Sequence, residues 1–116
     1  MLRTGEQYLQ SLRDGRQVWI NGERVKDVTV HPAFRPIVSL RARLYDMARE
    51  AKYKDLMAYR DETSNEPCNL ALKLPKTQAD WQDKRRYVDA QLQEIGGVVV
   101  RIGDETIGEL WSLYDG

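Results

Sequence analysis

The chain has 116 residues, of which 41% are apolar and 31% are charged, and its 18 basic and 18 acidic side chains cancel to a formal charge of zero. This composition is typical of one globular domain, and the balanced charge excludes the basic footprint of a protein that binds nucleic acid or an anionic membrane. The single cysteine, Cys68, excludes an internal disulfide and a cysteine-rich metal site. Because the chain lacks a signal-peptide core and any apolar run near the ~18 residues of a membrane span, we expect a cytoplasmic location.

The first part of the chain predicts a short helix and then a β-hairpin. Thr4 and Gln7 have the spacing of a capping box, and Gly15 is suited to end the helix in the left-handed conformation. Asn21-Gly22 lies between two β-rich arms in residues 16–25, and both residues accept the positive φ of a two-residue hairpin turn. The apolar face of the helix would consist of Tyr8, Leu9 and Leu12.

Residues 28–36, VTVHPAFRP, predict a connector that leads into a longer helix over residues 36–52. Each proline disfavours the α conformation of the residue before it, His31 and Arg35, and Pro36 fits the first position of a helix. We interpret His31 as a turn residue that hydrogen-bonds the backbone, not as a catalyst. The predicted apolar stripe of the helix is Ile37, Leu40, Leu44, Met47 and Ala48.

The rest of the sequence predicts mostly helix. Residues 52–61 are typical of one or two helical turns, 62–67 of a loop and 68–74 of a strand. Thr77 is the expected cap of a helix over residues 78–96. The outer face of this helix would carry Asp80, Asp83 and Lys84. Its buried seam would consist of Trp81, Val88, Leu92 and Ile95. A last amphipathic helix over 105–114 would present an apolar stripe that needs cover, formed by Ile107, Leu110 and Trp111.

Together these elements predict a single domain that is mainly α with a small β-hairpin and strand component, an α+β fold. The residues alone indicate little chemistry, because the chain has no phosphate-cradling glycine loop and no serine in a nucleophile motif. Asp104 and Glu105 are adjacent carboxylates at a predicted helix start, where the helix dipole explains them better than acid–base work.

The segment TGEQYLQSLRDGRQVWINGERVKDVTVHPAFRP, followed by LYD at 44–46, strongly resembles the start of the 4-hydroxyphenylacetate 3-hydroxylase family. Members of that family open with TG..Y..SL.DGR, a strand, GE.V.DV and HPAFR in the same order, and the likeness is strongest over residues 4–46. They are two-component monooxygenases that hydroxylate small phenolic substrates with reduced FAD, which a separate flavin reductase supplies. The resemblance therefore implies the helical N-terminal domain of an acyl-CoA-dehydrogenase-like flavoenzyme.

The intact enzymes of that family are several times longer than this chain. The resemblance thus implies that residues 1–116 are an N-terminal domain truncated from a longer enzyme and inactive by themselves. A middle β-rich domain and a C-terminal four-helix bundle would complete the flavin site and a homo-oligomer. Nearly all contacts to FAD would then lie beyond Gly116.

The resemblance also implies a substrate site at residues 100–105, VRIGDE, where the hydroxylases carry GR(S/T)PDY and use the arginine and tyrosine to hold the phenol. Arg101 and Asp104 are kept and Glu105 replaces the tyrosine, so we expect these three residues at the substrate. Arg101 could stabilise a developing phenolate or bind a carboxylate, and an ion pair with Asp104 or Glu105 is an equal alternative. Because of Glu105, a different acidic, phenolic or CoA-linked substrate is as suitable as a simple phenol.

Two alternatives stay open. The same superfamily includes 4-hydroxybutyryl-CoA dehydratase, which combines FAD with an iron–sulfur cluster and shares HP..RP and YKDLM with residues 1–60. That cluster needs two cysteines near residues 97–103, which read GVVVRIG here, so a dehydratase-like flavoenzyme would lack the cluster. The other alternative is a non-catalytic assembly module that self-associates through the stripe of residues 107–111.

Overall fold

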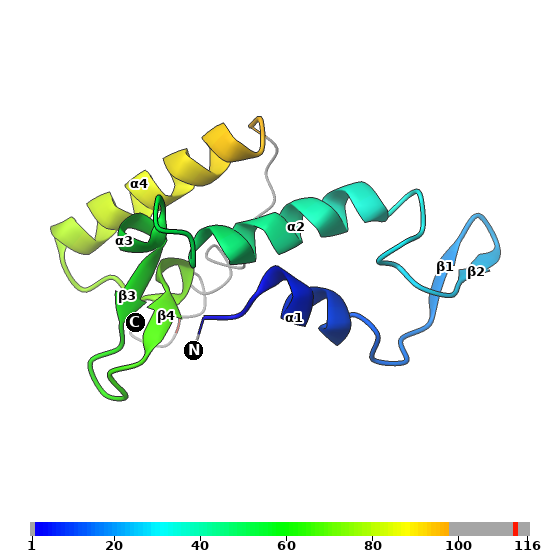
Figure 1. Cartoon of the computed structure of the whole chain (residues 1–116), viewed down its shortest axis with the longest axis horizontal. Helices are drawn as coiled ribbons and strands as arrows, with labels where there is room; N and C mark the ends of the chain where they lie inside the picture. The colour runs from blue at the N-terminus through cyan, green and yellow to red at the C-terminus, as the bar shows by residue number, and fades with distance from the viewer. Residues whose placement is uncertain (1, 98–112, 114–116) are drawn as a thin grey trace.

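The computed structural model describes residues 2–97 and 113, and Figure 1 shows how its helices and strands are arranged. Two apolar cores lie on either side of the helix over residues 35–47. The two pairs of strands are antiparallel, β1 with β2 and β3 with β4, and form separate sheets. This mixture of helices and small sheets confirms the coarse α+β prediction. In chain order the elements are α1 (Gly5–Ser11), β1 (Val18–Ile20), β2 (Glu23–Val25), α2 (Arg35–Met47), α3 (Lys54–Met57), β3 (Ala58–Arg60), β4 (Pro67–Asn69), the 3-10 helix η1 (Leu70–Leu72) and α4 (Gln78–Glu94).

Helix α1 begins with the predicted capping box. Thr4 Oγ1 accepts a hydrogen bond from Gln7 N at 3.0 Å, and Gln7 Oε1 accepts one from Thr4 N at 2.9 Å. The predicted end was wrong, since the helix stops at Ser11, and Gly15, with φ +80°, lies in the loop that leads to β1. The expected apolar face is confirmed, because Tyr8 is buried and both Leu9 and Leu12 pack beside it.

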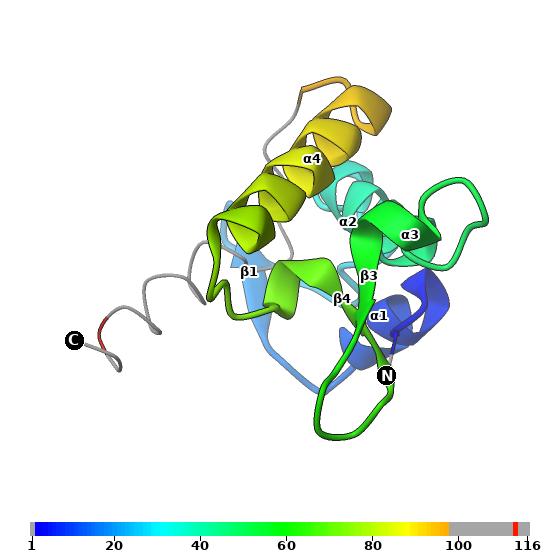
Figure 2. The ribbon, with the colours of Figure 1, turned by 90° about the vertical axis from the view of Figure 1, so that its left-hand side faces the viewer.

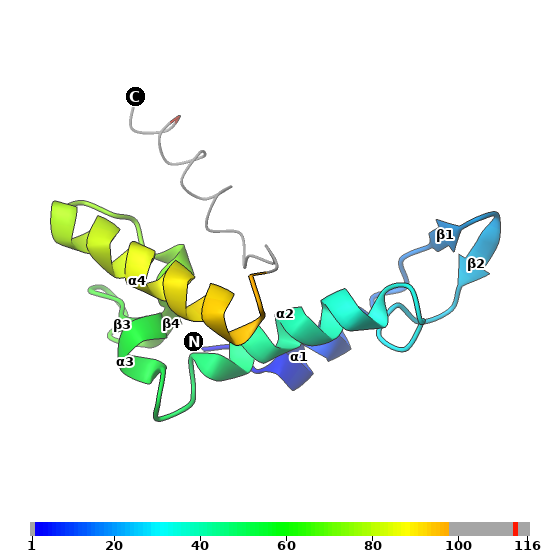
Figure 3. The ribbon, with the colours of Figure 1, turned by 90° about the horizontal axis from the view of Figure 1, so that it is seen from above.

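The hairpin prediction is confirmed. Asn21 and Gly22 have φ values of +51° and +80°, and the pairing of Ile20 with Glu23 leaves these two residues as the turn. The hairpin projects beyond the N-terminal end of α2 (Figures 1 and 3). Its central residue Trp19 is 60% exposed, so the described residues leave one face of the hairpin open.

The connector between hairpin and helix is a turn, as predicted. His31 O accepts hydrogen bonds from Phe34 N and Arg35 N, and His31 Nδ1 accepts one from Ala33 N at 3.2 Å. His31 therefore holds the turn through the backbone. The expectation that Arg35 avoids the α conformation was wrong, because the turn already bends the chain and Arg35 is the first residue of α2, with Pro36 in the first turn.

Helix α2 is buried on two sides: α1 packs along one side of it, and the C-terminal end of α4 approaches the other side, where Glu94 pairs with Arg43 (Figures 1 and 2). Leu44, Met47 and Ala48 lie at 0% exposure in the larger core, with side chains from α3, η1 and α4. Val38 and Ala42 face α1 in the smaller core, where Tyr8 stacks on Tyr45 with ring centroids 5.1 Å apart. The predicted stripe was thus wrong at Ile37, which is 43% exposed, because Val38 takes the inward position.

Beyond α2 the chain reverses earlier than predicted. The helix ends at Met47 and not at residue 52, since successive turns carry the chain to α3, where Met57 packs into the larger core. Residues 58–60, expected to be helical, form β3. The strand expected over 68–74 is β4, shortened to Pro67–Asn69, because Asn69 Oδ1 accepts from Ala71 N and starts η1.

Helix α4 has the predicted cap at Thr77 but a different buried face. Its buried side chains are Tyr87 and Gln91, one position before Val88 and Leu92 of the expected seam, which are partly buried. Ile95, at the C-terminal cap of the helix, is buried as predicted. Gln91 can be buried because its Nε2 donates to the Tyr87 hydroxyl at 2.8 Å. Trp81 is 59% exposed, so its predicted place in the core was wrong. Among the described residues, each helix is too short or too polar to cross a lipid bilayer.

Helices α1 and α2 come into close contact at Gly5. Its N–H donates to Asp46 Oδ1 at 2.7 Å, and a Cβ added at this position would lie 2.5 Å from Asp46 Oδ2 and 2.6 Å from Ala42 O. The Arg3 guanidinium lies 5.8 and 5.7 Å from the centroids of the Tyr8 and Tyr45 rings and covers the same junction. Only glycine therefore fits at this contact without displacing a backbone carbonyl.

We expect Gly5→Ala to destabilise the chain by about 1–3 kcal/mol, because the new methyl group forces α1 away from α2. Urea unfolding followed by circular dichroism measures the change. Ser39→Ala, at an exposed position of α2, is the matched control and should change the free energy of unfolding by less than about 0.5 kcal/mol. An unchanged stability of Gly5→Ala would contradict the close contact.

Candidate functional site

The residues predicted to contact substrate, Arg101, Asp104 and Glu105, lie outside the described residues. The apolar stripe of residues 107–111 lies outside them as well. The candidate site that the structure does describe is a groove of about 610 Å³ at the C-terminal end of α2. Its walls come from Ala48 and Arg49 after α2, from α3, from β3 and from Leu2 at the start of the chain.

Three cations and one aromatic ring dominate this groove. Arg49 Nη1 donates to Leu2 O at 3.2 Å, and Arg60 Nη1 donates to Asn65 O at 2.8 Å, so both guanidinium groups are held by backbone carbonyls. Lys54 and Asp55, from the first turn of α3, also line the groove. Because cations outnumber carboxylates here, the groove suits an anionic group lying against an apolar wall.

Tyr59 forms the aromatic part of the groove. Partial burial raises the pKa of its hydroxyl, and the nearby Cys68 and Asp61 act in the same direction. The tyrosine is therefore a neutral hydrogen-bonding group at physiological pH. Lys73 Nζ lies 5.8 Å from the ring centroid and links this wall to the start of α4.

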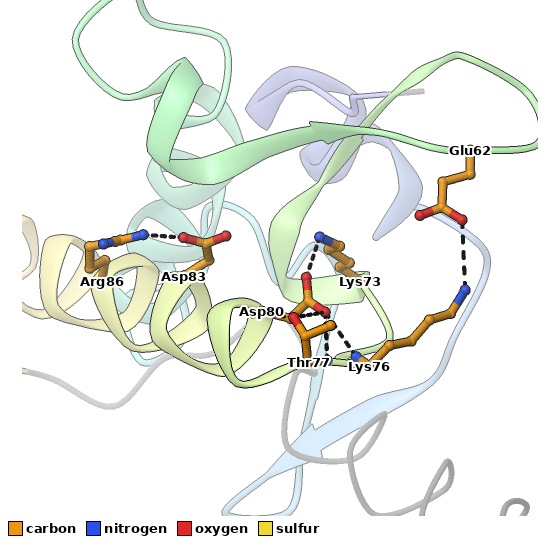
Figure 4. A network of polar contacts seen from close by, with 7 residues as sticks. All are labelled: Glu62, Lys73, Lys76, Thr77, Asp80, Asp83 and Arg86. Carbon is orange, nitrogen blue, oxygen red and sulfur yellow. Dashed lines mark hydrogen bonds and ion pairs between the residues drawn. The ribbon is translucent and has the colours of Figure 1, made fainter.

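A polar network fixes the start of α4 (Figure 4). Asp80 accepts hydrogen bonds from Lys73 Nζ at 2.5 Å and from the backbone N–H groups of Lys76 and Thr77 at 3.0 and 2.9 Å. Thr77 Oγ1 in turn accepts from Asp80 N at 3.2 Å, which completes a capping box. Asp80 was predicted to face water, and that prediction was wrong because its carboxylate is the acceptor that holds three segments together.

The charges of this network perturb one another in the expected directions. The hydrogen bond from Lys73, together with those at the cap, holds the pKa of Asp80 well below its usual range, and Asp80 raises the pKa of Lys73. Farther along α4, Asp83 pairs with Arg86 and Lys84 Nζ donates to Ala71 O at 2.8 Å, so Lys84 was also wrongly assigned to water. These side chains position α4 and η1; they do not form an acid–base pair.

A second network ties α2 to the C-terminal end of α4. Arg43 pairs with Glu50 and with Glu94, and Glu94 Oε2 also accepts from the Tyr53 hydroxyl at 2.8 Å. The two carboxylates raise the pKa of Arg43, and the bonds from Tyr53 and then Arg43 lower the pKa of Glu94. In the described part of the chain no three side chains of His, Cys, Asp or Glu gather as metal ligands would. The described residues therefore offer binding and positioning groups.

Comparisons with known proteins agree with this architecture. A family model described as 4-hydroxyphenylacetate 3-hydroxylase N terminal matches residues 4–116. The 4-hydroxyphenylacetate 3-monooxygenase oxygenase component of Pseudomonas aeruginosa is 50% identical over 62 residues, which are 53% of this chain and 12% of that protein. The oxygenase component from a Geobacillus species is 32% identical over 112 residues, which are 96% of this chain and 22% of that protein.

Solved structures show the same fold. The oxygenase component of 4-hydroxyphenylacetate 3-monooxygenase, complexed with FAD and 4-hydroxyphenylacetate, matches with a TM-score of 0.72 at 30% identity, over 79% of this chain and 19% of the other. An oxygen-tolerant archaeal 4-hydroxybutyryl-CoA dehydratase from N. maritimus matches with a TM-score of 0.71 at 25% identity, over 81% of this chain and 19% of the other. These matches show that the chain shares its fold with one part of each of these two enzymes, about a fifth of their length.

The chain belongs to the 4-hydroxyphenylacetate 3-hydroxylase family, as the match over residues 4–116 shows. It spans about a fifth or less of the length of the relatives named above, with 12% and 22% of the two oxygenase components covered. The family resemblance seen in the sequence is thereby confirmed.

Sequence reasoning missed the groove altogether. Its walls are contributed by Leu2, by the end of α2 and by Pro67, which only the tertiary fold brings together. The cap at Asp80 could have been found, because a threonine followed three residues later by an acidic residue is a recognised N-terminal helix pattern. No local pattern indicates that Lys73 would reach the same carboxylate.

The lowered pKa of Asp80 predicts a pH-dependent contribution to stability. A carboxyl group whose pKa is lower in the folded state stabilises the fold above its unfolded pKa of about 4, and this contribution is lost as the pH falls toward the folded value. Asp80→Asn should therefore lower the thermal midpoint at pH 7, and the difference from wild type should shrink as the pH falls below about 4.

Asp89→Asn is the matched control on the same helix, since Asp89 Oδ2 lies 3.9 Å from Arg85 Nε in a more exposed pair. It should change the midpoint little at either pH. A difference between wild type and Asp80→Asn that stays constant from pH 7 to pH 3 would contradict the role of the Asp80 carboxylate.

Proposed function

We propose that this chain is the N-terminal part of a flavin-dependent monooxygenase that hydroxylates a small phenolic or other aromatic substrate with reduced FAD and O₂. The observation that carries the proposal is the family match over residues 4–116. Relatives with two different phenolic substrates in their names support it, since a 4-nitrophenol monooxygenase oxygenase component from Rhodococcus opacus is 35% identical over 101 residues. A separate flavin reductase would supply the reduced cofactor, as the relatives' description as oxygenase components indicates.

The proposed reaction inserts one oxygen atom of O₂ into a ring C–H bond and releases the other as water, with two electrons from the reduced flavin. The described residues contain no glycine-rich phosphate loop ahead of a helix, which is the motif of one class of dinucleotide-binding fold. FAD would be held mostly by polypeptide that this chain does not include. The role left to residues 2–97 is to brace the neighbouring substrate segment and to exclude water from one side of it.

We further propose that the chain is the helical N-terminal domain of an acyl-CoA-dehydrogenase-like enzyme that acts as a homo-oligomer in the cytoplasm. Arg101, Asp104 and Glu105 are the substrate-binding residues in this proposal. The structural match to the archaeal dehydratase supports a second candidate, a dehydratase-like flavoenzyme. The sequence GVVVRIG at 97–103 favours the monooxygenase over it, because no thiolate is present there to hold an iron–sulfur cluster.

The size of the native product decides between an enzyme and an assembly module. We expect an antibody raised against this chain to detect, in its source cell, a protein several times larger than 116 residues. That product should hydroxylate 4-hydroxyphenylacetate or a related phenol when given reduced FAD, whereas the purified 116-residue chain should not. A native product of 116 residues would refute the enzyme and favour the module, and hydroxylation by the short chain would refute its dependence on the rest of the protein.

In the full-length product, Arg101→Ala should raise the KM for a phenol that carries a carboxylate by about tenfold or more, because a charge-assisted hydrogen bond is lost. The kcat should fall less, since the interaction already exists before the reaction. Arg85→Ala removes an exposed arginine of α4 and serves as the control. Equal KM values for wild type and Arg101→Ala would show that Arg101 pairs within the protein.

A further inference from the structure

A second hollow, of about 320 Å³, lies at the base of the hairpin, between β2 and the loop that follows α1. Four basic residues line it, namely Arg13, Arg16, Arg24 and Lys26, and Asp27 is the acidic residue among its lining. Such a concentration of cations around one cavity is unusual in a chain whose total formal charge is zero. The hollow is separate from the groove beside α3, with which it shares no lining residue.

The hairpin itself places two of these cations. Val25 pairs with Val18 and is only 5% exposed, so this pair forms an apolar floor. Arg24 lies in β2 and Lys26 directly follows the strand, so the two residues flank Val25, and both are exposed while Val25 is buried. The two flanking cations therefore lie on either side of a fixed buried residue.

The other two cations are held by carboxylates. Arg13 Nε donates to Asp27 Oδ2 at 3.0 Å and Arg13 Nη2 donates to Thr29 Oγ1 at 3.0 Å. Arg16 donates through Nε and Nη2 to the two oxygens of Asp14, at 2.8 and 2.6 Å. Each guanidinium is thereby fixed by two of its nitrogens, and neither needs to be ordered when a ligand arrives.

Both carboxylate oxygens of Asp27 accept hydrogen bonds, Oδ2 from Arg13 and Oδ1 from Thr29. Hydrogen bonds from the Thr29 hydroxyl and backbone, followed by the one from Arg13, lower its pKa to about 2. The carboxylate stays ionised and balances the charge of Arg13, with which it is paired. Arg24 and Lys26 make no hydrogen bond or ion pair with any residue that the structure describes.

The surrounding segment increases the positive potential. Residues 13–41 contain six basic and three acidic residues, a formal charge of +3, which the remainder of the chain offsets. Two of those three acids, Asp14 and Asp27, are already paired. A hollow with low-dielectric walls focuses such a potential on its interior.

We propose that this hollow binds a diphosphate group. Planar guanidinium groups match phosphate oxygens in pairs, and an ammonium group serves as a point charge beside them. Four cations and the two carboxylates paired with Arg13 and Arg16 leave a net charge of +2, which suits a ligand with at least two negative charges, such as a diphosphate. This inference does not depend on the proposed function, because it concerns residues outside the segment assigned to substrate.

Isothermal titration of the 116-residue chain with inorganic pyrophosphate tests the proposal. We expect saturable binding at one site that weakens as salt is raised, since ions screen an exposed charged site. Arg24→Gln together with Lys26→Gln should weaken the binding by at least about tenfold, because two charge-assisted contacts are lost. The variant's thermal midpoint shows whether it is folded, as is expected for two exposed positions.

Lys76→Gln with Arg85→Gln removes the same charge from exposed positions away from both hollows and should retain wild-type affinity. ADP distinguishes the source of the group: affinity equal to that of pyrophosphate indicates that the diphosphate alone is recognised, and tighter binding indicates a nucleotide carrier. An absence of saturable binding, or an equal loss in the two double variants, would overturn the proposal and leave only a diffuse effect of surface charge.

Discussion

The burial of α2 on two opposite sides is the constraint on which the rest of the structure depends. Leu44, Met47 and Ala48 complete one core, while Val38 and Ala42 complete the other. A helix used in this way cannot rotate to improve one contact without worsening the other. The approach of Gly5 to Asp46 then sets how closely α1 can lie on α2, and the pairing of Arg43 with Glu50 and Glu94 ties the same helix to the end of α4.

Local sequence patterns predicted the structure correctly wherever it depends on contacts between residues close together in the chain. The capping box of Thr4 and Gln7, the turn at Asn21-Gly22 and the backbone contacts of His31 each depend on residues within a few positions, and all were correctly predicted. The predictions failed where a tertiary contact decides. The inward position of Val38 in place of Ile37 depends on where α1 lies, and the outward position of Trp81 depends on where the larger core ends.

The same distinction explains what could be predicted about the site. The family was readable from the ordered motifs of residues 4–46, because motifs are sequence features, and the family comparison confirms it. The groove could not be predicted from the sequence, because Leu2, Arg49 and Pro67 come together only in the folded chain. The described residues supply a braced frame of ion pairs and capped helices.

The position of the hairpin has a practical consequence. Its turn, Asn21-Gly22, is exposed and projects away from both cores, so extra residues there would touch neither of them. Loop tips of this kind are where polypeptide chains best tolerate insertions. A short fluorescent or affinity tag placed between these two residues would therefore report on the protein in a cell while leaving the helices, and the chain's own ends, as they are.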